Sequence, residues 1–361
     1  MQPSGYIPTP DLSRASTLPA HWYVDPEYLD VEKQRIFWRT WQAVGHADAV
    51  AHAGDYLACE VLGEPLVVVR GEDGVLHAFS NVCRHRASTI AEGQGNCRAL
   101  RCPYHGWTYG LDGRLLGQPE FEGVQNWDRS SVCLPAMPVE TWGPFLFVRL
   151  DSGGPPLTEV LGDIPREARR LGCNLDRLRF YQRKDYLLNC NWKVYVDNYL
   201  EGYHVPVAHP GLFRELDYSR YRVETHRYYS SHYAPIRPAQ GDPERRYTSD
   251  GAAALYYWIF PNFMLNIYPD NLSSNIILPL GHDRTLTIFE WFFPPEHLAP
   301  DSGVARRTLA FSDEIQIEDI KLCENVQRGL RSRTYDTGRL SVKRENGVHH
   351  FHMLMHEFLT A

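Results

Sequence analysis

Residues 83–110 read CRHRASTIAEGQGNCRALRCPYHGWTYG and contain three cysteines, two histidines and four glycines. Each histidine closely follows a cysteine, as Cys83-x-His85 and Cys102-x-x-His105, and sixteen residues separate the two pairs. Cysteine and histidine are the side chains that bind zinc and iron–sulfur clusters in proteins. The stretch is therefore a candidate metal site, and the arrangement of its two pairs decides which metal it fits.

The division of ligands between the two pairs distinguishes the candidate metals. A typical zinc finger takes both cysteines from one loop and both histidines from another, whereas here each loop supplies one of each. In a Rieske [2Fe–2S] cluster two thiolates hold one iron and two imidazoles hold the other, so each loop can reach both irons. We therefore predict a Rieske cluster, with zinc as the alternative. Cys97 has no histidine at either spacing and is interpreted as a free thiol in the connecting loop.

The stretch lies in a β-rich part of a chain that is long enough for two domains. The 361 residues carry a formal net charge of -7, which argues against a nucleic-acid binder. Short strand-like runs separated by Gly, Pro and Asp turns fill residues 55–150, and the composition of residues 151–160 predicts a linker. We expect an N-terminal helical segment (1–44), a β-rich domain (45–150) and a larger domain (151–361).

Both helices and strands are predicted outside the β-rich domain, which gives an α+β fold class. A helix is predicted at 28–44, strand-like runs at 254–268, 272–280 and 284–293, and a last clear helix at 312–330. No apolar run reaches the roughly 20 residues that span a bilayer. The N-terminus does not read as a secretory signal, so we expect the protein in the cytoplasm.

A second histidine motif lies downstream, in NYLEGYHVPVAHPGL at residues 198–212. Glu201 and His204 are three apart and would share a helix face. Pro206 is expected to end that helix, so that His209 turns back from a loop toward His204. Two histidines with a carboxylate form the facial triad of non-haem Fe(II) oxygenases, which leaves positions open for O₂. The alternative is a helix end with two exposed histidines.

The carboxylate of the triad is expected on the helix at 312–330, for which Ser312 is a plausible N-cap. Asp319 lies four residues before Cys323, so the two share the apolar stripe of this helix. A carboxylate buried there needs compensation, which a metal supplies. Glu318 also lies near the stripe, and spacing alone does not decide between the two acids.

The words NVCRHR and CPYHGWTY, together with Glu201-x-x-His204-x4-His209, resemble the α (oxygenase) subunits of Rieske non-haem iron oxygenases. The resemblance implies a Rieske [2Fe–2S] domain inserted in a helix-grip-like catalytic domain of antiparallel sheet plus helices. EDIKLCENVQRGLRS resembles the family's ligand helix, whose second acid binds iron, which favours Asp319 over Glu318. Two sets of ligands are thus implied: Cys83, His85, Cys102 and His105 for the cluster, and His204, His209 and Asp319 for a mononuclear Fe(II).

The resemblance also implies partners and an electron path. No glycine-rich nucleotide motif is found in the chain, so electrons from NAD(P)H would arrive through a separate reductase of the flavin or ferredoxin type. The family is trimeric, and a homotrimer is expected here. Glu201 matches the carboxylate that joins the iron ligand His204 to the position of His105 in a neighbouring subunit. One oxygen atom of O₂ would enter the substrate and the other would leave as water.

The substrate class follows from resemblance to one branch of the family. NCNWKVYVDNYLEGYHVPVAHP and IFPNFMLNIYPDNLSSNIILPLG resemble choline monooxygenases, carnitine oxygenases and betaine demethylases, which hydroxylate or N-demethylate quaternary ammonium compounds. Aromatic faces hold such cations. If residues 254–260 form a strand, Tyr256, Trp258 and Phe260 share one of its faces. Tyr203, Trp258 and Phe260 are the candidate substrate residues. The alternative for such aromatic residues is core packing. The rival functions are an aromatic-ring-hydroxylating (di)oxygenase α subunit and, without catalysis, a Rieske electron carrier or redox sensor.

Overall fold

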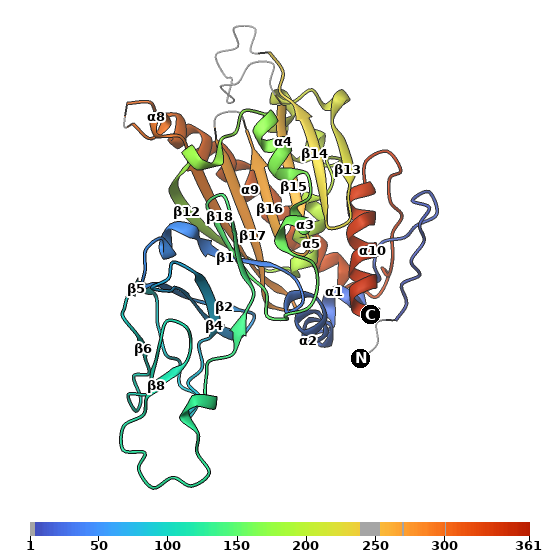
Figure 1. Ribbon diagram of the computed structural model, residues 1–361. Helices are drawn as coiled ribbons and strands as arrows, with labels where there is room; N and C mark the ends of the chain where they lie inside the picture. The colour runs from blue at the N-terminus through green and yellow to red at the C-terminus, as the bar shows by residue number, and fades with distance from the viewer. Residues whose placement is uncertain (1–3, 239–252, 269–270, 300) are drawn as a thin grey trace. The chain divides into compact units, whose positions relative to one another are not determined.

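The structure is a computed structural model that describes four stretches of the chain: residues 4–238, 253–268, 271–299 and 301–361. The chain forms two compact units, which Figure 1 shows as one ribbon coloured along the sequence. The smaller unit is Phe37–Gly154, and the larger unit combines Met1–Ile36 with Pro155–Ala361. The smaller unit is therefore an insertion in the larger one, and the predicted α+β class is confirmed. Within the described stretches no helix is long and apolar enough to cross a membrane.

The smaller unit is built from three antiparallel sheets, with strand orders β5-β2-β3-β4-β9, β1-β11-β10 and β6-β7-β8. In its central strand β3, Val67 and Val69 face the hydrophobic core that contains Cys83 and Cys102, whereas Val68 faces a second core. The strands of this unit are β1 Gln42–His46, β2 Asp55–Val61, β3 Glu64–Arg70, β4 Leu76–Ser80, β5 Gln94–Asn96, β6 Leu100–Arg101, β7 Thr108–Tyr109, β8 Leu115–Gly117, β9 Ala136–Met137, β10 Val139–Trp142 and β11 Phe145–Val148.

The larger unit contains a seven-stranded antiparallel sheet of order β12-β18-β17-β16-β15-β14-β13. The runs predicted at 272–280 and 284–293 correspond to β17 and β18, whereas the run at 254–268 is a hairpin of two strands. Its turn contains Pro261, which has no N–H for a sheet ladder. The strands are β12 Arg179–Leu188, β13 Arg222–Thr225, β14 Tyr229–Pro235, β15 Ala253–Ile259, β16 Phe263–Ile267, β17 Leu272–Gly281 and β18 Arg284–Phe293.

Two helices of the larger unit lie next to the second histidine motif or carry its candidate acids: α5 Trp192–Tyr199, which precedes the motif, and the long α9 Val304–Leu330, which contains Glu318 and Asp319. They pack against each other, α5 also contacts β17, and α9 also contacts β12. The last helix, α10 Asn346–Thr360, packs on β13. The other helices of the larger unit are short: α1 His21–Val24, α2 Glu27–Glu32, α3 Leu157–Leu161, α4 Ile164–Arg170, α6 Val205–Ala208, α7 Pro210–Glu215 and α8 Pro295–Leu298.

Two predicted helix boundaries are wrong. The helix expected at 28–44 ends at Phe37 after a π-helical turn, and the chain then enters β1, which pairs with β11. The apolar spacing of the segment continues across this change, so periodicity alone did not reveal it. The helix expected at 312–330 begins at Val304, so Ser312 lies inside it and is not its N-cap.

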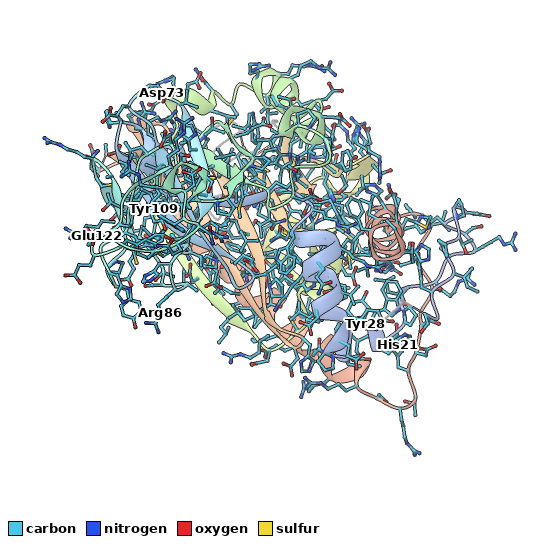
Figure 2. The ribbon with its side chains drawn as sticks, turned by 60° about the horizontal axis from the view of Figure 1, so that its bottom comes forward. His21, Tyr28, Asp73, Arg86, Tyr109 and Glu122 are labelled. Carbon is cyan, nitrogen blue, oxygen red and sulfur yellow. The ribbon has the colours of Figure 1, made fainter. Side chains whose placement is uncertain are left out.

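The N-terminal helices are fastened to the first turn of α5 by buried polar contacts. Glu32 pairs with Lys193 and accepts a hydrogen bond from the Trp192 indole at 2.7 Å. The side chains of Glu32 and Lys193 are both fully buried. Figure 2 labels His21 and Tyr28, whose rings lie 5.7 Å apart beside this contact region. The N-terminal segment therefore supports the helix that leads into the second histidine motif.

Candidate metal centres

The two loops of the smaller unit bring the four predicted cluster ligands together. Cys83 and Cys102 are buried, and their side chains lie within hydrogen-bond distance of each other. The rings of His85 and His105 have centroids 4.6 Å apart. Gly106 follows the second histidine with φ +74°, a backbone conformation that glycine adopts without strain, and its N–H bonds the Cys102 carbonyl at 3.1 Å.

The donor atoms in these loops fit an iron–sulfur cluster. The Nδ1 atom of His85 is buried and has no hydrogen-bond partner within the described part of the chain, which leaves it available to a metal. Burial raises the pKa of the Cys102 thiol, but backbone N–H groups of Tyr104 and His105 and the Cys83 side chain outweigh it and lower this pKa. A lowered pKa favours the thiolate that binds metal.

Nearby groups support the loops without competing for a metal. The Tyr109 hydroxyl, labelled in Figure 2, lies 3.4 Å from Cys83 Sγ and accepts the Arg84 N–H at 3.0 Å. His85 stacks on Trp107 with ring centroids 4.9 Å apart. Cys97 lies at the edge of the same core as a free thiol, and burial raises its pKa.

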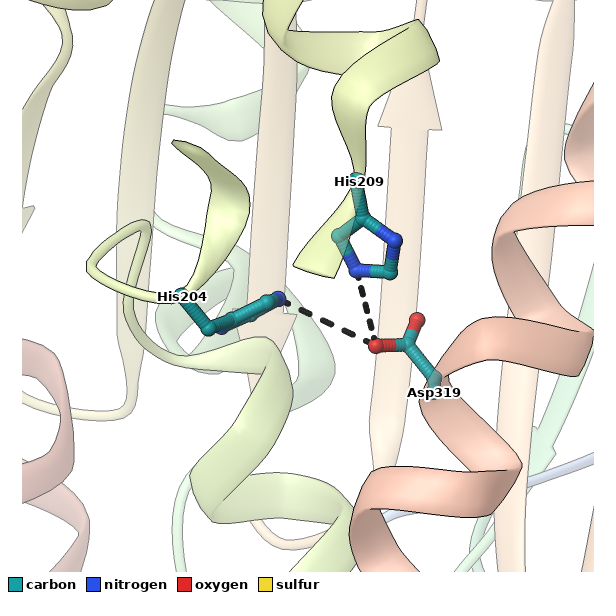
Figure 3. Close-up of side chains that lie close together, drawn as sticks. All are labelled: His204, His209 and Asp319. Atoms are coloured by element: carbon teal, nitrogen blue, oxygen red, sulfur yellow. Dashed lines mark hydrogen bonds and ion pairs between the residues drawn. The ribbon is translucent and has the colours of Figure 1, made fainter. Parts of the chain in front are cut away.

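In the larger unit, His204, His209 and Asp319 converge from separate segments, as Figure 3 shows. Their ligand atoms all lie within 4.8 Å of one another. Asp319 Oδ1 is 3.0 Å from His209 Nε2 and 3.8 Å from His204 Nε2. Two imidazoles and one carboxylate with this convergence match the donor set of a facial triad. The alternative of two exposed histidines is wrong, because the His209 side chain is only 1% exposed.

The backbone that presents these histidines differs from the predicted one. Glu201 and His204 lie in the bend between α5 and α6, rather than on one face of a continuous helix. Pro206 stands in the first turn of α6, where its missing N–H is not needed, so it begins a helix instead of ending one. The bend is held by Glu201, which accepts the backbone N–H groups of Tyr203 and His204.

Carboxylates orient both imidazoles by contacting Nδ1, the ring nitrogen that points away from Asp319. Glu201 Oε1 lies 2.5 Å from His204 Nδ1, and Glu318 Oε2 lies 2.6 Å from His209 Nδ1. Burial lowers the pKa of His209, but the hydrogen bonds and charges of Asp319 and Glu318 outweigh it, and the pKa is raised. The two neighbouring acids thus meet His209 from opposite sides, and only Asp319 lies where both Nε2 atoms point.

A cavity of about 140 Å³ opens beside the triad. Its polar walls include Asn198, Asn266, Ser273, Asn275 and Gln316, and Asn198 also donates to Asp319 Oδ1 at 2.7 Å. No lysine or arginine lines it within the described part of the chain. Among the described residues, the aromatic side chains that line it are Tyr195, Tyr199, Tyr221, Tyr256, Tyr268, Phe289, Trp291 and Phe311.

The three predicted substrate residues are not among those lining the cavity. Tyr203 is 58% exposed, and Trp258 is fully buried against Phe351 of α10 with ring centroids 5.3 Å apart. Phe260 packs on another residue of α10. Strand alternation correctly places Tyr256 on the same face as Trp258, but the cavity covers only the Tyr256 end. The polar residues of the cavity wall were not identified from the sequence. Their signal in the sequence was asparagine and serine at alternate positions of buried strands, as at Ser273 and Asn275.

His232 lies behind the cavity wall and takes no part in the triad. It is fully buried on β14, and its Nδ1 lies 2.7 Å from the hydroxyl of Tyr221, one of the lining tyrosines. Burial lowers the pKa of His232 from 6.5 to about 3. The imidazole is therefore neutral at physiological pH and acts as a fixed partner of the tyrosine.

We predict that His232 makes the protein less stable in mild acid. Below about pH 6.5 the unfolded chain binds a proton at this position and the folded chain does not. The free energy of unfolding therefore decreases as the pH is lowered, by up to about 1.4 kcal/mol per pH unit. His232→Asn, which keeps an acceptor for Tyr221, should flatten the dependence of the melting temperature on pH between about pH 5 and pH 7. His52→Asn, at a side chain that is 87% exposed, is the control. An unchanged slope in His232→Asn would contradict the assignment.

Comparisons with known proteins agree with this geometry. Residues 40–128 match the Rieske [2Fe-2S] domain family, and residues 175–361 match the family described as ring hydroxylating alpha subunit (catalytic domain). The chain is 38% identical to the chloroplastic choline monooxygenase of Arabidopsis thaliana, over 98% of this chain and 85% of that protein. It is 32% identical to the carnitine monooxygenase oxygenase subunit of Escherichia coli (strain K12), over 94% and 93%.

Solved structures give the same picture. The quaternary ammonium Rieske monooxygenase CntA in complex with L-carnitine matches with a TM-score of 0.83 and 29% identity, over 96% of this chain and 97% of that one. A naphthalene 1,2-dioxygenase variant bound to phenanthrene matches with a TM-score of 0.80 over 100% and 96%, but at 18% identity. The second likeness is one of fold alone.

Proposed function

Because this chain belongs to the Rieske oxygenases with a ring-hydroxylating α-subunit catalytic domain, we propose that it is the oxygenase component of a two-component monooxygenase acting on a small quaternary ammonium compound. Members of this family carry a Rieske [2Fe–2S] cluster and a mononuclear iron, and so does this protein. The observation that carries the substrate proposal is the aromatic cavity beside the triad. Permanent cations bind to aromatic faces, and no described basic side chain opposes one there.

The proposed ligands are the residues whose donor atoms converge. Cys83, His85, Cys102 and His105 would hold the cluster, and His204, His209 and Asp319 would hold the iron. When bound, the iron activates dioxygen with electrons that the cluster supplies. Glu201 and Glu318 hold the Nδ1 atoms of the two histidines, so that each Nε2 faces the metal position.

The electron supply involves partners that a single chain does not contain. We propose a separate flavin- or ferredoxin-type reductase and a homotrimer in which Glu201 joins His204 to the partner's cluster. The contact of Glu201 with His204 Nδ1 supports the first half of that bridge. The solved structure of a CntA oxygenase is described as giving insight into inter-subunit electron transfer, which supports the second half by likeness. A cytoplasmic location stays a prediction from the sequence.

The proposal is tested by substrate-dependent oxygen uptake. The purified protein with a surrogate reductase should consume O₂ with at least one member of a panel of choline, carnitine, glycine betaine and related quaternary amines. Formaldehyde release then separates hydroxylation of an N-methyl carbon, which removes that methyl group, from hydroxylation of any other carbon of the substrate. Uptake only with small arenes, with a cis-diol product, would overturn the proposal in favour of the aromatic-ring rival.

Removal of the proposed carboxylate ligand should remove the mononuclear iron and leave the cluster in place. Asp319→Ala is expected to lower bound iron from about three to about two atoms per chain while the visible absorbance of the cluster persists. Glu324→Gln, an acid-to-amide change on the same helix at a residue that bonds Asn189, is the control and should retain all the iron. Loss of the cluster absorbance in Asp319→Ala would mean that the residue has another role.

The carboxylate at His204 should control electron transfer rather than metal content. Glu201→Gln is expected to keep iron and cluster but to slow single-turnover oxidation of the reduced cluster by about 10- to 100-fold. Glu318→Gln makes the same chemical change at the other imidazole, away from the proposed bridge. Equal slowing in both variants would assign the effect to ring orientation and would contradict the bridge.

A further inference from the structure

Two hydrogen-bond donors on the sheet side of the cavity have no acceptor among the residues that the structure describes. The indole Nε1 of Trp291 and the amide Nδ2 of Asn275 are buried and unpartnered among the described residues, and both side chains line the cavity. Trp291 is 1% exposed and Asn275 is 2% exposed. Trp291 pairs with Ser273 across β17 and β18, two residues from Asn275, so the two side chains are diagonal neighbours on one sheet face.

The Asn275 amide lies at the end of a series of hydrogen bonds. The Tyr199 hydroxyl lies 3.0 Å from Asn266 Oδ1 and 3.2 Å from the carbonyl oxygens of Tyr257 and Leu265. Asn266 Nδ2 donates to Asn275 Oδ1 at 2.8 Å and to Ser273 Oγ at 3.1 Å. This arrangement leaves Asn275 Nδ2 as the free end of the series. The Trp291 indole is only ever a donor, so no rearrangement of protons turns its nitrogen into an acceptor.

Buried donors without an acceptor are unfavourable unless a bound molecule satisfies them. We infer that Trp291 and Asn275 form a subsite that donates hydrogen bonds to an uncharged oxygen of the substrate, such as a hydroxyl group. The inference rests on the proposed function, because it takes the cationic end of the substrate to be held by the aromatic walls. It assigns a specificity role to two residues on adjacent strands that contribute nothing to the triad.

The charges around the cavity favour a neutral oxygen over a carboxylate. The formally charged side chains among the described lining residues, apart from imidazoles, are the acids Glu201 and Asp319. No described lysine or arginine would pair with a carboxylate of the substrate, and a bound Fe(II) would already have its charge offset by Asp319 and Glu201. The subsite itself donates two uncharged hydrogen bonds, so it favours a cationic alcohol over a zwitterion that carries a carboxylate.

Equilibrium binding to the anaerobic, metal-loaded protein tests this subsite without relying on turnover. The probes are choline, n-propyltrimethylammonium, in which a methyl group replaces the hydroxyl, and glycine betaine, which carries a carboxylate. We expect choline to bind about tenfold more tightly than either, since satisfied buried donors discriminate to this extent. In Trp291→Phe and Asn275→Leu the preference for choline over n-propyltrimethylammonium should fall toward one.

The control is Trp258→Phe, the same chemical change at a buried tryptophan of the same sheet that does not line the cavity. It should keep the preference for choline, and cluster absorbance and melting temperature show which variants are folded. If Trp291→Phe fails to fold, Asn275→Leu provides the same comparison.

Equal affinity of the wild type for choline and n-propyltrimethylammonium overturns the subsite but leaves cation binding intact. Tighter binding of glycine betaine overturns the neutral-oxygen assignment, and binding of no cation instead refutes the proposed function.

Discussion

The catalytic half of the molecule depends on keeping one carboxylate, Asp319, buried opposite two imidazoles. The helix that carries it, α9, therefore buries a face that is partly polar. Polar side chains on that face form hydrogen bonds with α5 and with the segment before it. Tyr195 donates to Gln316 at 2.6 Å, and the backbone N–H of Asn191 donates to Gln327 at 2.8 Å. A shift of α9 by one turn would leave these groups unpaired in the interior, which is strongly unfavourable. The polar packing of the two helices thus fixes the register that places the carboxylate.

The two metal sites present histidine nitrogens in opposite ways, and each choice has a visible cause. At the triad, acids occupy both Nδ1 atoms and direct the Nε2 atoms inward. In the cluster loops, stacking on Trp107 holds the His85 ring, and its Nδ1 has no partner among the described residues. The surroundings of a histidine, rather than the histidine itself, select the nitrogen that meets the metal.

Short-range patterns in the sequence identified the cysteine, histidine and acidic side chains that lie close together in the structure, because residue spacing within a loop is itself local. Glu318 and Asp319 were left undecided by helix periodicity, since adjacent acids both lie near the buried stripe and only the position of His209 separates them. The aromatic residues show the same limit. Alternation along β15 correctly grouped Tyr256 with Trp258, but α10, which buries the second of these, is formed by residues almost a hundred positions later. The missing information in both cases was which distant segment packs where.

The insertion of one unit within the other also determines the order in which parts of the chain can fold during translation. Residues 37–154 contain all the strands of their own sheets, and the N–H of Asp151 bonds the carbonyl of Trp38 where the chain enters and leaves them. The helices before them have partners made much later: Lys193 for Glu32, and Asp197 for Tyr23, with His352 of the last helix on the same Asp197. As the chain emerges from the ribosome, the inserted unit has everything it needs to fold first. The earliest helices must wait until the residues around Lys193 and Asp197 have been translated, and His352 joins the same contacts only later.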